Sequence, residues 1–339
     1  MAVLLTGGAG FIGTHTAVEL LAAGHDIVVA DNLYNAKPEA LRRVRELSGK
    51  DFPFYRCDIR DREGLRRVFA ENDIAAAVHF AGLKSPPESV SKPLDYFDNN
   101  VSGTVALCEV MAEAGCRRMV FSSSATVYGM KNPMPLREDM PTGEVVNPYG
   151  RTKFMIEGIL RDLCAADPEW AAVSLRYFTL AGAHASGRIG EDARGTPVNL
   201  MPRLVQAAVG KTPALTVTGT DYDTPDGTGI RDYIHVVDLA RGHLAAVEYA
   251  LAHTGAEAVN LGVGRGYSVR ELIKTFEEVN GVPVPTVNQP RRPGDVAVSY
   301  SDPSKAARLF GWKAEKTLAD MCRDSWRWQS MNPSGYPED

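Results

Sequence analysis

Short apolar runs alternate with longer stretches in which apolar residues recur every three or four positions throughout the first half of the chain. The short runs predict strands at residues 2–6, 26–30, 52–55, 75–80, 118–122 and 172–177, and the longer stretches predict helices at 12–23, 62–71, 101–114 and 149–165. Strands that alternate with helices in this way form a parallel sheet with helices on both faces. Right-handed crossovers then give an α/β, doubly wound fold.

The pattern changes after about residue 180. The segment 181–232 is rich in Gly, Pro, Thr and Asp and holds one helical pattern near 200–209. A helix and strand at 236–251 and 258–261 are able to return to the first sheet, and two more helical patterns follow at 269–280 and 318–329. We therefore expect a first domain over 1–180 plus a returning segment at about 232–262. The second, smaller α/β domain over 181–339 is then discontinuous, with a cleft between the two.

Composition excludes several classes of protein. The 339 residues are 44 % apolar and 23 % charged with a net charge of −5, as in a soluble globular protein. Neither a dense Lys/Arg block nor a run of eighteen apolar residues is present, so we expect no nucleic-acid partner and no membrane span. The five cysteines are scattered without a CxxC pair, and the N-terminus lacks a charged lead. These features predict a cytoplasmic protein without a structural metal.

A glycine-rich run, TGGAGFIG at residues 6–13, follows the first predicted strand and opens a helix. Glycines at 7, 10 and 13 permit a tight turn, close approach of the backbone to a pyrophosphate, and close packing of helix on strand. The start of the helix offers free N–H groups and the positive end of its dipole to the phosphates. Asp31 ends the second strand, where a carboxylate binds the ribose hydroxyls and repels a 2′-phosphate. The sequence therefore predicts a Rossmann domain that binds NAD rather than NADP.

A second constellation is the run YGRTK at residues 149–153, in which Tyr149 and Lys153 share one helix face. Asn147 is placed to cap this helix and Pro148 to occupy its first turn. A phenol with a pKa near 10 is a poor base at neutral pH, but a nearby lysine cation and a positive nicotinamide ring favour the phenolate. The run SSS at 122–124 ends the fifth strand, at the sheet edge where ligands bind. We predict that Tyr149 is a catalytic base assisted by a serine hydroxyl.

Beyond these features, the chain resembles the UDP-glucose 4-epimerases, which are extended short-chain dehydrogenases/reductases. The similarity extends from about residue 3 to 337 and is carried by the runs FAGLK (80–84), DNN (98–100), SSSATVYG (122–129), GIRDYIHV (229–236) and RRPGD (291–295). It implies an NAD-dependent isomerase that interconverts UDP-galactose and UDP-glucose through a transient 4-keto sugar. It also implies a homodimer, in which the helices at 101–114 and 149–165 face the same helices of a second subunit.

The resemblance also implies site residues. Tyr149, Lys153 and Ser124 would be catalytic, with Ser124 bridging the sugar hydroxyl to Tyr149. The residues implied for the NAD site are Gly7, Gly10, Phe11, Ile12, Gly13, Asp31, Asn32, Asp58, Ile59, Phe80, Ala81, Gly82, Lys84, Asn99, Ser124, Tyr149, Lys153 and Phe178. Those implied for the UDP-hexose are Lys84, Ser124, Thr126, Tyr149, Thr179, Asn199, Leu200, Thr216, Val217, Thr218, Arg231, Tyr233, Arg292, Asp295 and Ser299. Arg231 and Arg292 suit a diphosphate because a guanidinium binds it with paired, charge-assisted hydrogen bonds.

Related nucleotide-sugar enzymes provide the alternatives. The 4,6-dehydratases place Asp and Glu directly after their catalytic hydroxyl residue, whereas this chain has Ala125 and Thr126, which excludes dehydration. UDP-glucuronate decarboxylases likewise carry a Glu at the position of Thr126. A 4-epimerase of UDP-pentoses or UDP-uronates stays open. A non-catalytic NAD-binding scaffold is disfavoured because such proteins usually lose the tyrosine or the lysine.

Two positions depart from the family pattern. Thr179-Leu180 stands where Asn-Pro is common, and the shorter threonine leaves one diphosphate contact open, with water as a possible bridge. Ser299 stands where epimerases restricted to plain hexoses have a tyrosine beside the sugar. The smaller side chain leaves room for an acetamido group, which predicts activity on UDP-GlcNAc and UDP-GalNAc as well. A shift of one residue in the alignment would put Tyr300 at this wall instead.

Overall fold

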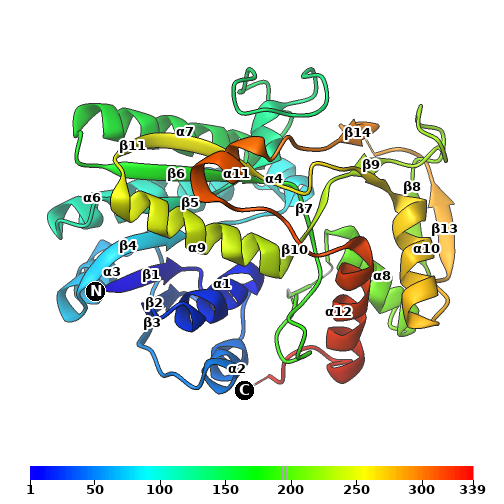
Figure 1. Cartoon of the computed structure of the whole chain (residues 1–339), viewed down its shortest axis with the longest axis horizontal. Coiled ribbons are helices and arrows are strands. Elements are labelled where there is room, and N and C mark those ends of the chain that lie inside the picture. The colour runs from blue at the N-terminus through cyan, green and yellow to red at the C-terminus, as the bar shows by residue number, and fades with distance from the viewer. Residues whose placement is uncertain (193, 196, 293, 339) are drawn as a thin grey trace.

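The computed structural model describes residues 1–192, 194–195, 197–292 and 294–338. Its centre is a seven-stranded sheet in the order β11-β6-β5-β4-β1-β2-β3 (Figure 1). Every neighbouring pair in this sheet is parallel, and the order β3-β2-β1-β4-β5-β6 is that of the Rossmann fold, which confirms the predicted fold class. The strands are β1 (Ala2–Thr6), β2 (Asp26–Asp31), β3 (Phe54–Arg56), β4 (Ile74–His79), β5 (Arg118–Ser124), β6 (Ala171–Tyr177) and β11 (Gly255–Leu261).

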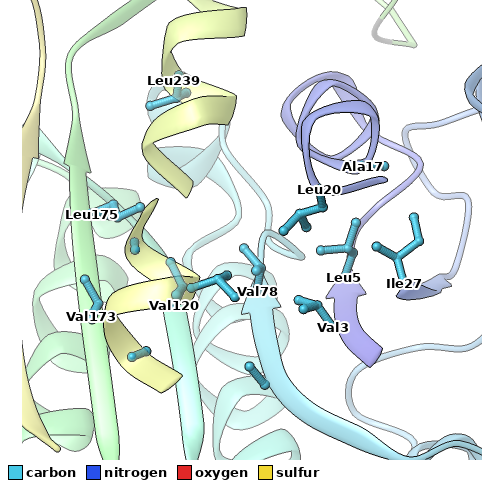
Figure 2. Packing of buried hydrophobic residues seen from close by; sticks show 14 of the residues in the cluster. Val3, Leu5, Ala17, Leu20, Ile27, Val78, Val120, Val173, Leu175 and Leu239 are labelled. Atoms are coloured by element: carbon cyan, nitrogen blue, oxygen red, sulfur yellow. The ribbon is translucent and has the colours of Figure 1, made fainter. Parts of the chain in front are cut away.

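Helices cover both faces of this sheet. One face carries α1 (Phe11–Ala22), α2 (Pro38–Ser48) and α9 (Val236–Ala252), and the other carries α3 (Arg62–Glu71), α6 (Gly103–Glu113) and α7 (Pro148–Ala166). Figure 2 shows Leu20 of α1 and Leu239 of α9 with strand residues such as Leu5 and Val120. Leu4, between Val3 and Leu5, belongs to the core on the opposite face. Burial on both faces is why these strands read as continuous apolar runs.

The rest of the chain forms a second part around a core of its own, which includes Leu204, Phe276 and Met321. Its helices are α8 (Leu200–Ala208), α10 (Val269–Asn280) and α12 (Leu318–Met331), and α11 (Ser304–Phe310) packs back on α9. Three small sheets pair β7 (Thr179–Ala181) with β10 (Tyr233–His235), β8 (Leu215–Thr218) with β13 (Thr286–Gln289), and β9 (Ile230–Arg231) with both β12 (Tyr267–Ser268) and β14 (Val298–Ser299). Figure 1 shows this part beside the carboxyl ends of the central strands.

Short helical segments connect β4 to α6 and follow β5. They are α4 (Pro86–Ser91), α5 (Pro93–Tyr96), the π-helical turn η1 (Phe97–Ser102) and the 3-10 helix η2 (Ala125–Tyr128). In the described part of the chain, no helix combines the length and the apolar character needed to cross a membrane.

The structure differs from the sequence prediction at several elements. The pattern missed α2, because this helix is mostly polar: Ala40, Leu41 and Val44 are the apolar residues that it buries, and the ion pair of Glu39 and Arg43 occupies the rest of its buried face. β5 continues past the predicted end at 122, because Ser124 still pairs with Tyr177 of β6. The predicted helix 101–114 becomes a π-helical turn followed by α6.

Candidate active site

The turn between β1 and α1 is built around glycines that accept no side chain. Gly7 has φ = +69°, and a Cβ on it would lie 2.6 Å from the backbone N of Ala81. A Cβ on Gly13 would lie 2.6 Å from the Cα of Gly8, so a side chain there would push α1 off the turn. Gly10 caps α1 without a side-chain hydrogen bond. The first N–H groups of α1 therefore face outward and suit a phosphate.

Asp31 lies at the end of β2 with both carboxylate oxygens held by the backbone. Its Oδ2 accepts from the N–H of Ala9 at 3.0 Å, and its Oδ1 accepts from the N–H of Leu33 at 2.8 Å. Burial raises the pKa of Asp31, and these two hydrogen bonds oppose the rise. Leu33 has a left-handed backbone with φ = 60°, which turns the chain back toward the carboxylate. Asp31 is thus fixed at the position where a ribose would lie.

A cavity of about 360 Å³ opens along this edge of the sheet. Asp58 lies just outside its lining, where its Oδ2 accepts a hydrogen bond of 2.9 Å from Asn32. The predicted NAD-site residues that line the cavity are Gly7, Gly10, Phe11, Ile12, Gly13, Asp31, Asn32, Ile59, Phe80, Ala81, Gly82, Lys84 and Asn99. The glycine turn, the free helix start and the fixed carboxylate fit the pyrophosphate and ribose of a dinucleotide.

Tyr149 and Lys153 lie on the first two turns of α7, beyond the residues that line the cavity. As predicted, Asn147 caps this helix by accepting from the N–H of Gly150 at 2.9 Å, and Pro148 occupies its first turn. The Nζ of Lys153 lies 5.8 Å from the centroid of the Tyr149 ring. It also donates to the backbone oxygen of Ser122 at 2.6 Å. The lysine ammonium is therefore tied to the end of β5, beside the tyrosine.

Burial changes the pKa of both groups. Burial lowers the pKa of Lys153 to about 7, and the Glu157 carboxylate opposes this shift. Burial raises the pKa of the Tyr149 phenol, and the neighbouring Ser124 hydroxyl opposes that rise. Ser124, Tyr149 and Lys153 thus form one cluster. At neutral pH the phenolate needs a further positive charge close by, which is what a nicotinamide ring supplies.

A buried ionic network anchors α7 behind this cluster. Arg176 of β6 forms an ion pair with Glu157 at 2.7 Å, and the side chains are 4 % and 3 % exposed. Ser123 of β5 donates its hydroxyl hydrogen to Glu157 at 2.5 Å. The network therefore fixes α7 against the ends of β5 and β6 and holds Lys153 in position.

Asn100 is a positioning residue that the sequence analysis named only as part of a motif. Its Oδ1 accepts from the N–H of Leu83 at 2.8 Å, and its Nδ2 donates to the oxygens of Leu83 at 3.0 Å and of Thr152 at 3.1 Å. The buried amide thereby joins the turn after β4, which lines the cavity, to α7, which carries Tyr149. Only the folded chain brings these segments together.

Four of the residues predicted to bind the UDP-hexose belong to the first part: Lys84 lines the cavity, and Ser124, Thr126 and Tyr149 lie on β5, η2 and α7. The others lie in the second part or at its junction with the first, and none of them lines the cavity. Asn199 and Leu200 begin α8, and Thr216, Val217 and Thr218 belong to β8. Thr179 pairs with Tyr233 across β7 and β10, and Ser299 pairs with Arg231 across β14 and β9. Tyr233 and Val217 lie in the core of the second part, so their side chains are withdrawn from the surface. The Thr126 hydroxyl is also buried, without a partner among the described residues. Phe178 packs near η2 at the end of β6.

Arginines without acidic partners lie in the same part of the molecule. Within the described ranges, neither Arg231 nor Arg292 forms an ion pair, and the same holds for Arg203 of α8, which the sequence analysis missed. Burial and the positive charge of Arg292 lower the pKa of Arg203. Guanidinium groups that lack a carboxylate suit a bound anion. Arg203 is a single arginine among the apolar residues of α8, and such a position carries no sequence signal for anion binding. Asp295 lies three residues beyond Arg292, and Pro293 lies outside the described residues.

The model of the NAD dependent epimerase/dehydratase family matches residues 3–262. The chain belongs to this family. It is 58 % identical over 336 residues to the UDP-glucose 4-epimerase of Bacillus subtilis, covering 99 % of both chains. The resemblance stated from the motifs is thereby confirmed.

Solved structures of the family agree. The chain superposes with a TM-score of 0.96 and 51 % identity on the UDP-glucose 4-epimerase of Bifidobacterium longum in complex with NAD⁺ and UDP, covering 99 % of this chain and 100 % of that one. The UDP-Glc/GlcNAc 4-epimerase of Campylobacter jejuni matches with a TM-score of 0.84 and 37 % identity over 97 % and 99 % of the two chains. The cofactor of the family is NAD, and the cavity described above fits it.

Proposed function

We propose that this chain interconverts UDP-galactose and UDP-glucose by inverting carbon 4 of the sugar. The observation that carries the proposal is the cluster of Ser124, Tyr149 and Lys153, which lies at the carboxyl ends of the central strands next to the NAD cavity. When bound, NAD accepts and returns the hydride of carbon 4. The names of the relatives support the same reaction.

Each residue of the cluster has its own task. The Tyr149 phenolate takes the proton of the sugar 4-hydroxyl, and the Ser124 hydroxyl bridges the two oxygens. The Lys153 ammonium stabilises the phenolate and holds the nicotinamide ribose. Loss of this proton and of the carbon-4 hydride leaves a 4-keto sugar, which turns over about its link to UDP. Once carbon 4 regains its hydride on the other face, Tyr149 returns the proton to the oxygen. Positioning and electrostatics are therefore the contribution of the protein.

This reaction requires the protein to bind the UDP group tightly and the sugar weakly. Arg231 and Arg292 bind the diphosphate, Asn199 and Leu200 present the start of α8 to it, and residues 216–218 of β8 pass along the uracil. The absence of carboxylate partners for both arginines within the described residues supports their role. A firm hold on UDP keeps the reactive ketone bound while the sugar turns.

The sugar range depends on Ser299. Ser299 pairs with Arg231 in parallel strands, so the two side chains share one face of the small sheet. Tyr300, by contrast, lies beside Gly266, where a Cβ would be 3.8 Å from its ring. These contacts support Ser299 rather than Tyr300 as the residue beside the sugar. We therefore propose a second activity on UDP-GlcNAc and UDP-GalNAc, and the relative from Campylobacter jejuni is likewise named a UDP-Glc/GlcNAc 4-epimerase.

The domain division, the assembly and the compartment are parts of the same proposal. Pairing of β11 with β6 supports a first domain of 1–180 plus 232–262 and a second domain over the rest of 181–339.

We propose a homodimer through α6 and α7, and the exposed Val90, Leu94 and Met155 on α4, α5 and α7 support this face. Five buried free cysteines support a reducing cytoplasm.

The test uses the purified protein with no added NAD. It is incubated separately with UDP-galactose, UDP-GalNAc, a UDP-pentose and a UDP-uronate, and the 4-epimers are quantified by chromatography. We expect UDP-galactose to be converted without net formation of reduced cofactor, and UDP-GalNAc to be converted as well. Conversion of the pentose or uronate alone would favour the alternative. No conversion of any substrate after NAD is supplied would contradict the proposal.

A matched pair of variants tests the base. Tyr149→Phe removes the phenolic oxygen, and we expect the rate of UDP-galactose conversion to fall by about 10²–10⁴-fold. Tyr55→Phe is the control, because the Tyr55 hydroxyl accepts from Asn72 and donates to Glu71 far from the cluster. A Tyr149→Phe rate equal to that of the control would exclude Tyr149 as the base.

A further inference from the structure

Three segments far apart in the sequence meet at one end of the NAD cavity. The Nζ of Lys37 donates to the backbone oxygen of Tyr336 at 2.9 Å and forms ion pairs with Asp192 at 3.1 Å and Glu338 at 2.9 Å. The N–H of Tyr336 donates to Asp192 at 2.8 Å. We call Lys37, Asp192, Tyr336 and Glu338 the clasp.

The clasp lies at the adenosine end of the cavity. Lys37, Asp192 and Tyr336 line the same cavity as Asp31, which is fixed where the adenosine ribose would bind. Lys37 directly precedes α2, and Figure 1 shows the C-terminal end of the chain beside this helix. Tyr336 and Glu338 lie beyond the residues matched by the family model. The end of the chain thus supplies part of the cavity wall.

The C-terminal segment is held in place by packing as well as by charge. The Tyr336 ring is buried, lies 4.7 Å from the Trp328 ring centroid and stacks under the guanidinium of Arg43 at 5.1 Å. Its hydroxyl accepts from the N–H of Gly190 at 3.2 Å. Gly335 has φ = +80°, and a Cβ there would collide with the Asp192 carboxylate. The C-terminal segment is therefore packed against the protein and forms an ordered part of the cavity wall.

We propose that the clasp slows the release of bound NAD by closing the adenosine end of its cavity. The Lys37 side chain is only 9 % exposed, so its two ion pairs are partly shielded from water and hold Asp192 and Glu338 together. Opening this end requires these contacts to break. The inference rests on the NAD site and is independent of which UDP-sugar reacts. A cofactor that must return its hydride to the same sugar has to stay bound through both transfers, and the clasp serves that requirement.

The experiment measures NAD release from the loaded protein in the absence of sugar nucleotide. Free NAD is removed, and the NAD that appears in filtrates is assayed over time. Lys37→Met keeps the length of the side chain and removes the ammonium, and we expect release at least about tenfold faster than in the wild type. Lys131→Met is the matched control, because Lys131 is an exposed lysine that pairs with the exposed Glu144. We expect its release rate to equal that of the wild type.

A second variant separates the clasp from a general effect on folding. Glu338 is 73 % exposed, so Glu338→Gln leaves the packing intact, and we expect release about two- to fivefold faster. About 1 M NaCl screens the exposed pair and speeds release from the wild type more than from Glu338→Gln. Wild-type release rates in both variants would overturn the proposal. Faster release from Lys37→Met alone, without an effect of Glu338→Gln or of salt, would also overturn it, because Lys37 would then act through the fold.

Discussion

At the scale of single residues, Lys153 combines the chemistry of the site with a cost in stability. Its side chain is 5 % exposed, and burial lowers its pKa from 10.5 to about 7. Between pH 7 and 10.5 the Lys153 amine is mostly protonated in the unfolded chain and mostly neutral in the folded chain. The contribution of Lys153 to the free energy of unfolding therefore rises with pH across that window and is least favourable at pH 7 and below.

Replacing this lysine separates the two effects. We expect Lys153→Met to lower the rate of UDP-galactose conversion by about 10²–10⁴-fold, because the cation beside Tyr149 is lost. We expect the thermal midpoint of the NAD-free variant at pH 7 to be no lower than that of the wild type, since a buried cation is removed. Calorimetry and the chromatographic assay check the two results. A variant that stays active, or that unfolds well below the Lys131→Met control, would contradict this interpretation.

Ser299 sets the sugar range in this account. Ser299→Tyr places a ring on the face that Ser299 shares with Arg231, and we expect it to lower kcat/KM for UDP-GalNAc relative to UDP-galactose by at least about tenfold. Ser299→Ala keeps the space open and should leave the ratio unchanged. Steady-state kinetics on both substrates measure the ratio. An unchanged ratio in Ser299→Tyr would show that another residue limits the space beside the sugar.

At the scale of elements, the position of α7 depends on the buried pair of Glu157 and Arg176. Glu157→Gln leaves the Arg176 guanidinium buried without its counter-ion, and we expect a loss of about 3–5 kcal/mol in the free energy of unfolding. The same change removes the carboxylate that raises the pKa of Lys153, so this pKa falls further and the activity optimum moves to lower pH. Urea unfolding and a pH–rate profile measure both effects. Full stability with an unmoved optimum would contradict the role of the network.

The central sheet was predictable because burial on both faces imposes a nearly continuous apolar pattern on its inner strands, such as β1 and β4. The small strands of the second part were not, since β9, β12 and β14 have two residues each and two residues carry no period. The helix α2 was missed because it has few apolar residues, and an ion pair shares its buried face with Ala40, Leu41 and Val44. The local sequence pattern therefore predicts elements that bury mainly apolar side chains. Very short strands and mostly polar helices form through tertiary contacts, which the local pattern does not show.

The same distinction applies to the site. Tyr149, Lys153 and the glycine turn were predictable because each lies in a contiguous motif next to a strand end. Lys37 and Tyr336 were not assigned to the cavity, because their contact requires the end of the chain to return to the start of α2. Arg203 was missed for a related reason, since its proximity to Arg292 exists only in the folded chain.

At the scale of the whole molecule, buried neutral histidines predict sensitivity to acid. Burial lowers the pKa of His15 and His79 to about 3 and of His243 to about 4, from 6.5. Between the lowered pKa values and 6.5, the unfolded chain binds more protons at these histidines than the folded chain does. The free energy of unfolding therefore falls as the pH falls from 6.5 toward 3. Urea unfolding at a series of pH values measures this slope. We expect His15→Gln to reduce the slope and the exposed-site variant His253→Gln to leave it unchanged. A stability that is flat from pH 7 to 4 would contradict the prediction.

The two parts of the molecule divide the work of the proposed reaction. The central sheet carries the NAD cavity and the cluster around Tyr149, and the second part carries the arginines that we propose for UDP. Lys84, in the turn after β4, forms an ion pair of 3.1 Å with Glu191 from the segment that follows β7. This pair and the clasp join the two parts around the cavity. In the proposed reaction the sugar would then lie between a fixed cofactor and a fixed nucleotide.

The most direct test of the central claim follows the hydrogen on carbon 4. UDP-galactose deuterated at carbon 4 is incubated with the purified protein in ordinary water without added NAD, and the UDP-glucose formed is analysed by mass spectrometry and NMR. Because the hydride leaves carbon 4 and returns to the same carbon, we expect the product to keep its deuterium there. Loss of the deuterium to solvent, or UDP-glucose that carries hydrogen at carbon 4, would contradict the account.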